Sequence, residues 1–180
     1  MSLTSILSIA TALPPHSVSQ IEAKSAAKAM FNGRDALFDR LAGVFDNALI
    51  DRRQTVAPID WYREPHGWAE RTDLYVAATE ALFEQSAKTA ITRAGLAPAD
   101  IDRFCCHPGG AKVIEAIETA LALGPGTLDL ERDTLRDHGN MSAPTVLFVL
   151  DALIKRGLPD RVMMTAFGPG FTCAGLVLEQ

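Results

Sequence analysis

The 180-residue sequence has little cysteine and no long apolar run. Three cysteines, two of them adjacent, cannot form the disulfide framework of a small secreted domain, so we expect a reducing, cytoplasmic setting. The longest apolar runs, such as residues 145–150, are far too short to span a bilayer. The first residues also lack the basic segment and the small-residue cleavage site of a secretion signal. These absences predict a protein that does not enter a membrane.

An excess of positive charge is also absent. The sequence has 17 Lys and Arg against 22 Asp and Glu, a net charge of −5, whereas nucleic-acid binding proteins concentrate basic charge. No C-x-x-C, H-E-x-x-H, P-loop or G-x-G-x-x-G motif occurs, so nothing indicates a zinc, nucleotide triphosphate or dinucleotide site. We therefore expect neither a nucleic-acid partner nor a bound metal.

The composition that is present, 48% hydrophobic and 22% charged residues, is typical of a globular domain that can bury a core. Apolar spacing and Gly/Pro signals predict strands over residues 3–10, 103–106, 161–167 and 172–179. They predict helices over residues 19–33, 34–48, 72–94, 128–137 and 143–156, with another after residue 110, and connecting loops at 51–53 and 58–67. A tight turn joins the last two strands, so we expect an α/β fold with a mixed sheet.

The segment from His107 to Gly110 is the first candidate site. A strand delivers His107 to its carboxyl end, and two glycines then let backbone approach a ligand closely before a helix begins. The helix N-terminus there could also receive an anion. The alternative is a structural strand-to-helix turn that contains an ordinary histidine.

Two further segments have functional and structural interpretations. Gly139, Asn140, Met141 and Ser142 precede a strongly periodic helix, and asparagine and serine are common helix N-caps, so Asn140 is either a cap or a site residue. Residues 167–171 place two glycines around a proline, which by itself is simply a tight turn between strands.

The two adjacent cysteines invite comparison with a Cys-His pair. Successive side chains of a strand point to opposite faces, so Cys106 and His107 diverge. Cys105 shares a face with His107 but lies about 6.6 Å away along the strand, beyond hydrogen-bond reach. We interpret Cys105, Cys106 and Cys173 as small buried thiols.

Taken in order, the segments resemble the chalcone synthase and stilbene synthase family, the type III polyketide synthases. The strong part of the resemblance covers about residues 101–180 and consists of FCCHPGGAKVIEAIETALAL, LRDHGNMSAPTVLFVLDAL and FGPGF. The opening part resembles the family through SIATALPPHSVSQ, DNALIDRR and RTDLYVAATEALFEQSAKTAITRAGLAPADID. The resemblance implies a thiolase-like fold, here a shortened remnant of it.

The resemblance also implies a chemistry. Family members load an acyl group from coenzyme A onto a cysteine and extend it by decarboxylative condensation with malonyl-CoA. His107 and Asn140 match the catalytic histidine and asparagine, and Arg40 matches a basic position that grips coenzyme A. The active-site loops correspond to Gly109, Gly110, Met141, Ser142, Phe167, Gly168, Pro169 and Gly170. Acyl-CoA and malonyl-CoA are the implied substrates, with no tightly bound cofactor, and a homodimer is the implied assembly.

The sequence departs from the family in length. Family members are much longer, and their nucleophilic cysteine lies between the two parts present here. Residues 1–102 correspond to the N-terminal portion and residues 103–180 to the C-terminal portion, with the junction near Ile101–Arg103. None of the three cysteines matches the nucleophile's motif. We therefore expect no condensation by this chain alone.

Two alternatives stay open. The chain could be a non-catalytic remnant that associates with itself or with a full-length relative, because a shortened sheet leaves strand edges open. It could also be an internal-deletion product without a function of its own.

Overall fold

The computed structural model describes residues 3–31, 35–124, 126–168 and 171–180. The chain divides into two compact units, which we call the sheet unit (Met1–Leu13 with Tyr75–Gln180) and the helical unit (Pro14–Leu74). This division follows packing. The expected boundary between residues 102 and 103 has a different meaning, since it separates the portions that resemble the N-terminal and C-terminal parts of the family. That boundary stays a prediction.

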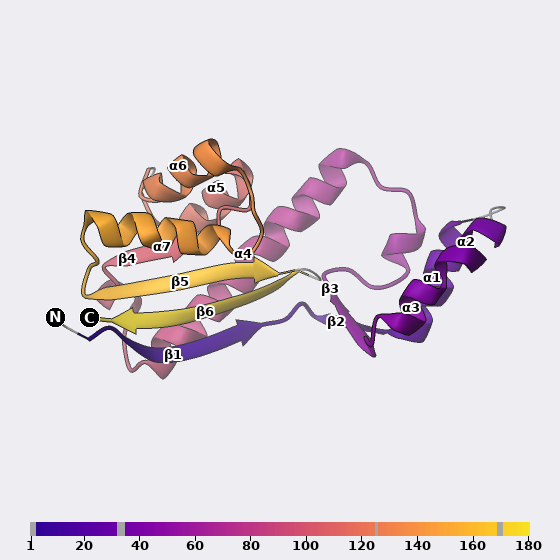
Figure 1. Ribbon diagram of the computed structural model, residues 1–180, viewed down its shortest axis with the longest axis horizontal. Coiled ribbons are helices and arrows are strands. Elements are labelled where there is room, and N and C mark those ends of the chain that lie inside the picture. The colour runs from indigo at the N-terminus through magenta and orange to yellow at the C-terminus, as the bar shows by residue number, and fades with distance from the viewer. Residues whose placement is uncertain (1–2, 32–34, 125, 169–170) are drawn as a thin grey trace. The chain divides into compact units, whose positions relative to one another are not determined.

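The sheet unit is built on four strands in the order β1-β6-β5-β4 (Figure 1). Strands β1 and β5 each pair with β6 antiparallel, whereas β4 and β5 are parallel. The expected mixed sheet is thus confirmed. The strands are β1 (Ser5–Ala12), β4 (Arg103–Cys106), β5 (Arg161–Gly168) and β6 (Thr172–Glu179).

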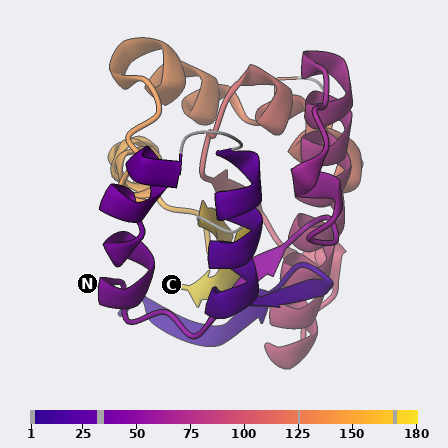
Figure 2. The ribbon, with the colours of Figure 1, turned by 90° about the vertical axis from the view of Figure 1, so that its right-hand side faces the viewer.

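Helices cover both faces of this sheet. They are α4 (Trp68–Arg93, within the sheet unit from Tyr75 onward), α5 (Ala111–Ala120), α6 (Asp129–His138) and α7 (Thr145–Arg156), and the short 3-10 turn η2 (Pro98–Asp100) precedes β4. In Figure 2, α7 is seen along its axis on one side of the strands, and α4 lies on the other. Phe83 of α4 and Ile117 of α5 are buried with Met163 on one face, and Val149 of α7 is buried with Met164 on the opposite face.

Local sequence explains the helix α7. Val146, Val149 and Leu153 recur at the spacing of one helical face, and all three are buried. Gly157 ends the helix with a φ of 108°, a conformation that favours glycine. The expected helix over 143–156 is confirmed, although it begins two residues later than expected.

The helical unit contains α1 (Gln20–Met30), α2 (Asp35–Leu41), α3 (Gly43–Asn47) and the 3-10 turn η1 (Trp61–Arg63). The expected capping box is confirmed, since the Ser19 hydroxyl accepts from the Glu22 N–H and the Glu22 carboxylate accepts from the Ser19 N–H. The expected helix over 34–48 is instead two short helices separated at Ala42, because Gly43 has a low helix propensity. The expected helix end at residues 32–33 and the start at residue 34 lie outside the described residues.

The sequence analysis did not predict a two-stranded sheet in the helical unit. β2 (His16–Ser19) pairs antiparallel with β3 (Arg52–Thr55). The expected loop at residues 51–53 is therefore wrong, because Arg52 and Arg53 lie in β3. Their pairing partners are more than 30 positions away in the sequence, and local composition carries no signal for that pairing.

His66 links η1 to the first turn of α4 within the helical unit. Its Nε2 lies 2.7 Å from the Trp61 carbonyl oxygen and its Nδ1 lies 2.7 Å from the Glu70 carboxylate. The imidazole also stacks on the Trp61 indole at 3.8 Å. Both neighbours are acceptors, so only the doubly protonated ring satisfies both bonds. The hydrogen bond to Glu70 therefore raises the pKa of His66.

We expect Glu70→Gln to lower the midpoint of the His66 titration, measured by NMR from the imidazole Hε1 resonance. Because the folded-state pKa is raised, the bond stabilises the fold below the ordinary pKa and is lost as pH rises through the folded-state value. The unfolding free energy should thus fall less steeply with pH in Glu70→Gln than in the unaltered chain. Glu64→Gln, at an exposed carboxylate nearby, is the control, and an equal change in both variants would refute the assignment.

Candidate active site

His107 lies at the carboxyl end of β4. Its backbone N–H donates to the Thr165 carbonyl at 2.9 Å, which continues the parallel pairing of β4 with β5 by one residue. The side chain is 4% exposed, and Gly109 and Gly110 then lead directly into α5. The structure therefore places His107 where the sequence analysis expected it, at the point where a strand turns into a helix.

Asn140 approaches this turn from another element. Gly139 ends α6 with φ 71° and ψ −173°, a conformation that is essentially restricted to glycine. The Asn140 Nδ2 then donates to the Gly109 carbonyl at 2.9 Å, and its Oδ1 accepts from the Ser142 N–H at 2.8 Å. The segments 107–110 and 139–142, about 30 positions apart in the sequence, are thus brought together.

The alternative interpretation of Asn140 as a helix cap is wrong. Helix α7 begins at Thr145, and the residue before it is Pro144, which makes no side-chain cap. The backbone N–H of Met141 donates instead to the Thr145 hydroxyl at 2.9 Å. Ser142 adopts a φ of 62°, which is strained for a residue other than glycine. This turn therefore presents Asn140 toward Gly109 and does not start the helix.

The described residues of the third segment, Phe167, Gly168 and Phe171, lie at the same end of the sheet. The Phe167 and Phe171 rings stack at 5.4 Å, and Phe167 also contacts the buried Phe83 ring at 6.2 Å. A side chain at Gly168 would come within 2.9 Å of the Thr172 hydroxyl, so Thr172 would have to shift to admit any larger residue there. The expected loop residues Pro169 and Gly170 lie outside the described residues.

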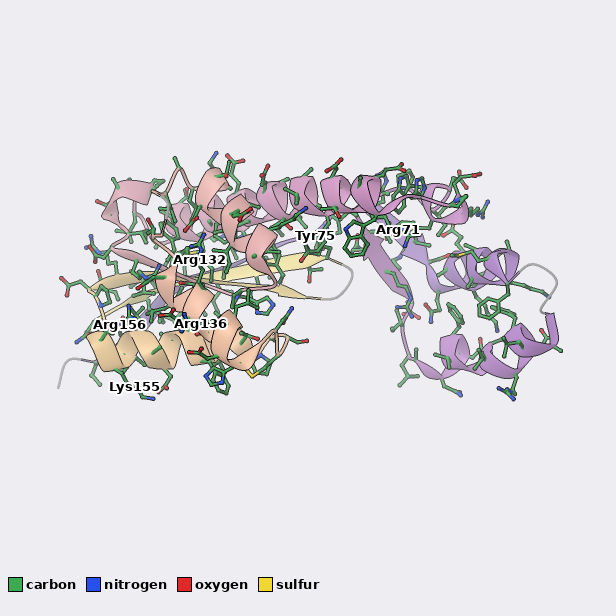
Figure 3. The ribbon with its side chains drawn as sticks, turned by 90° about the horizontal axis from the view of Figure 1, so that it is seen from above. Arg71, Tyr75, Arg132, Arg136, Lys155 and Arg156 are labelled. Carbon is green, nitrogen blue, oxygen red and sulfur yellow. The ribbon has the colours of Figure 1, made fainter. Side chains whose placement is uncertain are left out.

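Tyr75, which the sequence analysis missed, lies on the helix α4 (Figure 3) and forms an aromatic cluster with Phe171 and Phe167. Its ring lies 4.6 Å from that of Phe171, and its hydroxyl is within 3.5 Å of the place where a Gly109 side chain would begin. Burial raises the pKa of Tyr75, so the phenol stays protonated at neutral pH. Its position within the helix α4 gave no signal of proximity to His107.

The electrostatics suit the binding of a polarised carbonyl oxygen. Burial lowers the pKa of His107, so its imidazole is neutral at neutral pH and carries one N–H donor. Its Nδ1 is buried and has no hydrogen-bond partner among the described residues. Asn140 uses one of its two amide protons on Gly109, which leaves the other for a ligand. Two neutral donors beside a buried turn can stabilise a developing oxyanion.

The cysteines lie within the core. Cys105, Cys106 and Cys173 are at most 1% exposed, as expected for structural thiols. Cys105 belongs to the α7 face of the sheet and Cys106 to the opposite face. Burial raises the pKa of Cys105 and of Cys173 to about 12, and that of Cys106 also lies well above its usual range. None of the three is an activated nucleophile.

We expect all three thiols to react with iodoacetamide about a thousandfold more slowly in the folded chain than in denaturant at mildly alkaline pH. The physical reason is that both the thiolate fraction and the access to the sulfur are low. Intact mass after timed quenching measures the reaction. Rapid single alkylation of the folded chain would identify a reactive cysteine and contradict the structural interpretation.

One charged group near His107 was also missed. Glu131 of α6 is fully buried, and its carboxylate accepts from the Cys106 N–H at 2.9 Å. The signal was present in the sequence, since Glu131 occupies the apolar stripe between Leu128 and Leu135. Arg40, by contrast, is an exposed residue of α2 in the helical unit, and its expected contact with coenzyme A stays a prediction.

Comparison with known proteins identifies the class. The family model for the C-terminal domain of chalcone and stilbene synthases matches residues 73–180, more than half of the chain. The chain belongs to the chalcone and stilbene synthase family.

Two curated relatives are similar over part of their length. A 1,3,6,8-tetrahydroxynaphthalene synthase from Streptomyces peucetius subsp. caesius is 45% identical over 87 residues, which cover 47% of this chain and 23% of the relative. A 3-ketoacyl-CoA synthase 3 from Arabidopsis thaliana is 42% identical over 101 residues, which cover 53% of this chain and 21% of the relative. The chain thus spans less than a quarter of the length of either.

A solved structure shows the same fold. The β-ketoacyl-[acyl carrier protein] synthase III of Thermus thermophilus superposes with a TM-score of 0.51 at 23% identity, over 64% of this chain and 35% of that one. The chain therefore has a shortened thiolase-like fold with a mixed sheet packed between helices. No helix within the described ranges is long and apolar enough to cross a membrane.

Proposed function

We propose that this chain is an acyltransferase of the type III polyketide synthase class that supplies the carbonyl-binding half of the active site. The observation that carries the proposal is the hydrogen bond from Asn140 to Gly109, which joins the histidine turn to the asparagine turn. The family match over residues 73–180 supports the same assignment. The substrates are an acyl-CoA and malonyl-CoA, and coenzyme A thioesters act as substrates without a permanently bound cofactor.

The hydrogen-bond donors of His107 and Asn140 act in the decarboxylation of malonyl-CoA. When malonyl-CoA loses carbon dioxide, the electron pair of the broken carbon–carbon bond moves into the thioester as an enolate. The oxygen of that enolate needs hydrogen-bond donors, which His107 and the free amide proton of Asn140 provide. Condensation then requires attack of the enolate on an acyl thioester held by a cysteine. Because the three cysteines here are buried and their pKa values are raised, none of them is suited to be that thiol.

A combined binding and turnover measurement tests the proposal. With acyl-CoA and malonyl-CoA, we expect the chain alone to release no coenzyme A by condensation and to gain no acyl mass. Calorimetry should nevertheless show tighter binding of malonyl-CoA than of free coenzyme A, and His107→Ala should reduce that difference. His138→Ala, at an exposed histidine of the same unit, is the control. Equal affinity for both ligands in the unaltered chain, or an acyl adduct on Cys105, would overturn the proposal.

A second candidate, self-association, is favoured by an apolar groove in the sheet unit. The groove has a volume of about 240 Å³ and is lined by residues that include Ile9, Leu147 and Met164. Ile9 of the edge strand β1 is 57% exposed and Leu147 is 58% exposed. A second copy of the chain would cover this face. Light scattering after size-exclusion chromatography measures the oligomeric state. A dimer that Leu147→Glu dissociates supports this candidate, and a well-folded monomer excludes it.

A further inference from the structure

The outer edge of β4 is held by a buried carboxylate. β4 is the last strand of its sheet, and the His107 N–H faces β5. Because N–H groups alternate in direction along a strand, the Cys106 N–H points away from β5, on the side where the described residues form no further strand. The Oε1 of Glu131 accepts this N–H at 2.9 Å. A side chain of α6 thus takes the role of a neighbouring strand at the residue immediately before His107.

The charge of that carboxylate is balanced by Arg103. The Glu131 Oε2 accepts from the Arg103 Nη2 at 2.7 Å, and the Asp129 carboxylate lies 3.5 Å from the same nitrogen. The Glu131 side chain is 0% exposed and that of Arg103 is 12% exposed. Glu131 therefore connects the first residue of β4 to its last residue, and a buried ion pair of this kind holds its geometry only while both partners are present.

A second connection from the same segment lies on the other side of His107. Helix α6 carries Glu131 near its beginning, and Asn140 follows its end by two residues. Asn140 bonds the Gly109 carbonyl, while Glu131 bonds the Cys106 N–H. His107 lies between these two anchored positions. The segment that supplies Asn140 thus also holds the backbone that supplies His107.

We propose that Glu131, held by Arg103, is a positioning residue that fixes His107 relative to Asn140. It acts through the Cys106 N–H and does not touch the substrate. The expected effect of Glu131 on thioester binding rests on the proposed function. The expected effect on the position of His107 can be measured without any ligand.

The chain offers a matched control in a second ion pair. Glu118 of α5 is 8% exposed, accepts two bonds from Arg132 at 2.7 and 2.8 Å, and accepts the Leu128 N–H at 3.3 Å. This pair also combines an arginine with a backbone N–H on the side of α6, but none of its bonds reaches β4. Figure 3 labels Arg132 within this part of the sheet unit.

Paired variants separate positioning from stability. In Arg103→Met with Glu131→Met, the apolar replacement of a buried pair preserves folding while the Cys106 N–H loses its acceptor. We expect its amide to exchange about tenfold faster, and the His107 imidazole resonances to shift. In Arg103→Met with Glu131→Gln, an amide oxygen again accepts the N–H, so the resonances should return to their native positions. Glu118→Met with Arg132→Met should leave them unchanged.

The outcomes are distinguishable from those of the proposed function. Native His107 resonances in the Met pair, or equal shifts in the Met pair and the control pair, overturn the positioning role. A shift that the Gln variant does not reverse also overturns it. If the Met pair does not fold, Glu131→Asp supplies the test, because the shorter carboxylate cannot reach both partners and should shift His107. Malonyl-CoA affinity is measured separately. If malonyl-CoA does not bind, the proposed thioester site is refuted, while the His107 spectra still test whether Glu131 positions His107.

Discussion

Arg103→Leu is expected to lower the free energy of unfolding by about 3–5 kcal/mol at neutral pH, because it leaves the Glu131 carboxylate buried without a counter-charge. Urea unfolding followed by circular dichroism measures the loss. Arg136→Leu is the matched control, since the Arg136 side chain is 67% exposed and its ion pairs with Asp133 and Asp137 are solvated. That variant should lose less than about 1 kcal/mol. Similar losses in the two variants would contradict the buried pair.

The cost of Arg103→Leu should also depend on pH. Burial raises the pKa of Glu131, and the Arg103 charge partly opposes that rise. Removing Arg103 takes away this opposing charge and raises the pKa of Glu131 further, so the folded state disfavours the charged carboxylate more strongly than in the unaltered chain. A carboxyl whose folded-state pKa is raised stabilises the fold below its unfolded value and loses that contribution as pH rises through the folded value. The deficit should therefore be small near pH 4 and grow toward neutral pH. A deficit that grows on acidification would refute this assignment.

Phe83→Ala is the second change with a large expected effect, a loss of about 3–5 kcal/mol in unfolding free energy. Phe83 is 0% exposed, and its ring contacts Phe167 at the base of the aromatic cluster. The substitution leaves a cavity between α4 and the sheet. Thermal unfolding measures the effect, and Phe148→Ala, at a phenylalanine that is 45% exposed, should cost less than about 1 kcal/mol. Equal costs would show that α4 does not cover a core.

Elements with a local signal were predictable. The apolar stripe of α7 and the capping box of α1 both depend on residues a few positions apart, and both are present. The strand β4 and its histidine turn were found for the same reason, because a short apolar run ends at glycines. The pairing of β2 with β3 was missed, because it depends on contacts between distant segments that no local pattern encodes.

The candidate site also contains residues with a local sequence signal and residues without one. His107 and Asn140 were recognised through their motifs in combination, because the Asn140 motif alone favoured a helix cap. The bond from Asn140 to Gly109, which decides against the cap, spans 31 positions. Tyr75 reaches the turn from a helix that precedes β4, and its neighbours in the sequence gave no indication of this. Glu131 was detectable as a charge on an apolar stripe, although its partner Arg103 lies on a different element.

The chemical shift of a bound thioester carbonyl tests most directly whether His107 and Asn140 form one carbonyl site. Acetyl-CoA labelled with carbon-13 at the carbonyl is added to the unaltered chain and to His107→Ala, Asn140→Ala and the control His138→Ala. Hydrogen bonds from both side chains polarise the carbonyl. We therefore predict a downfield shift on binding that the control retains and that each of the other two variants reduces. A bound carbonyl without a shift, or the same shift in all four proteins, would contradict the site.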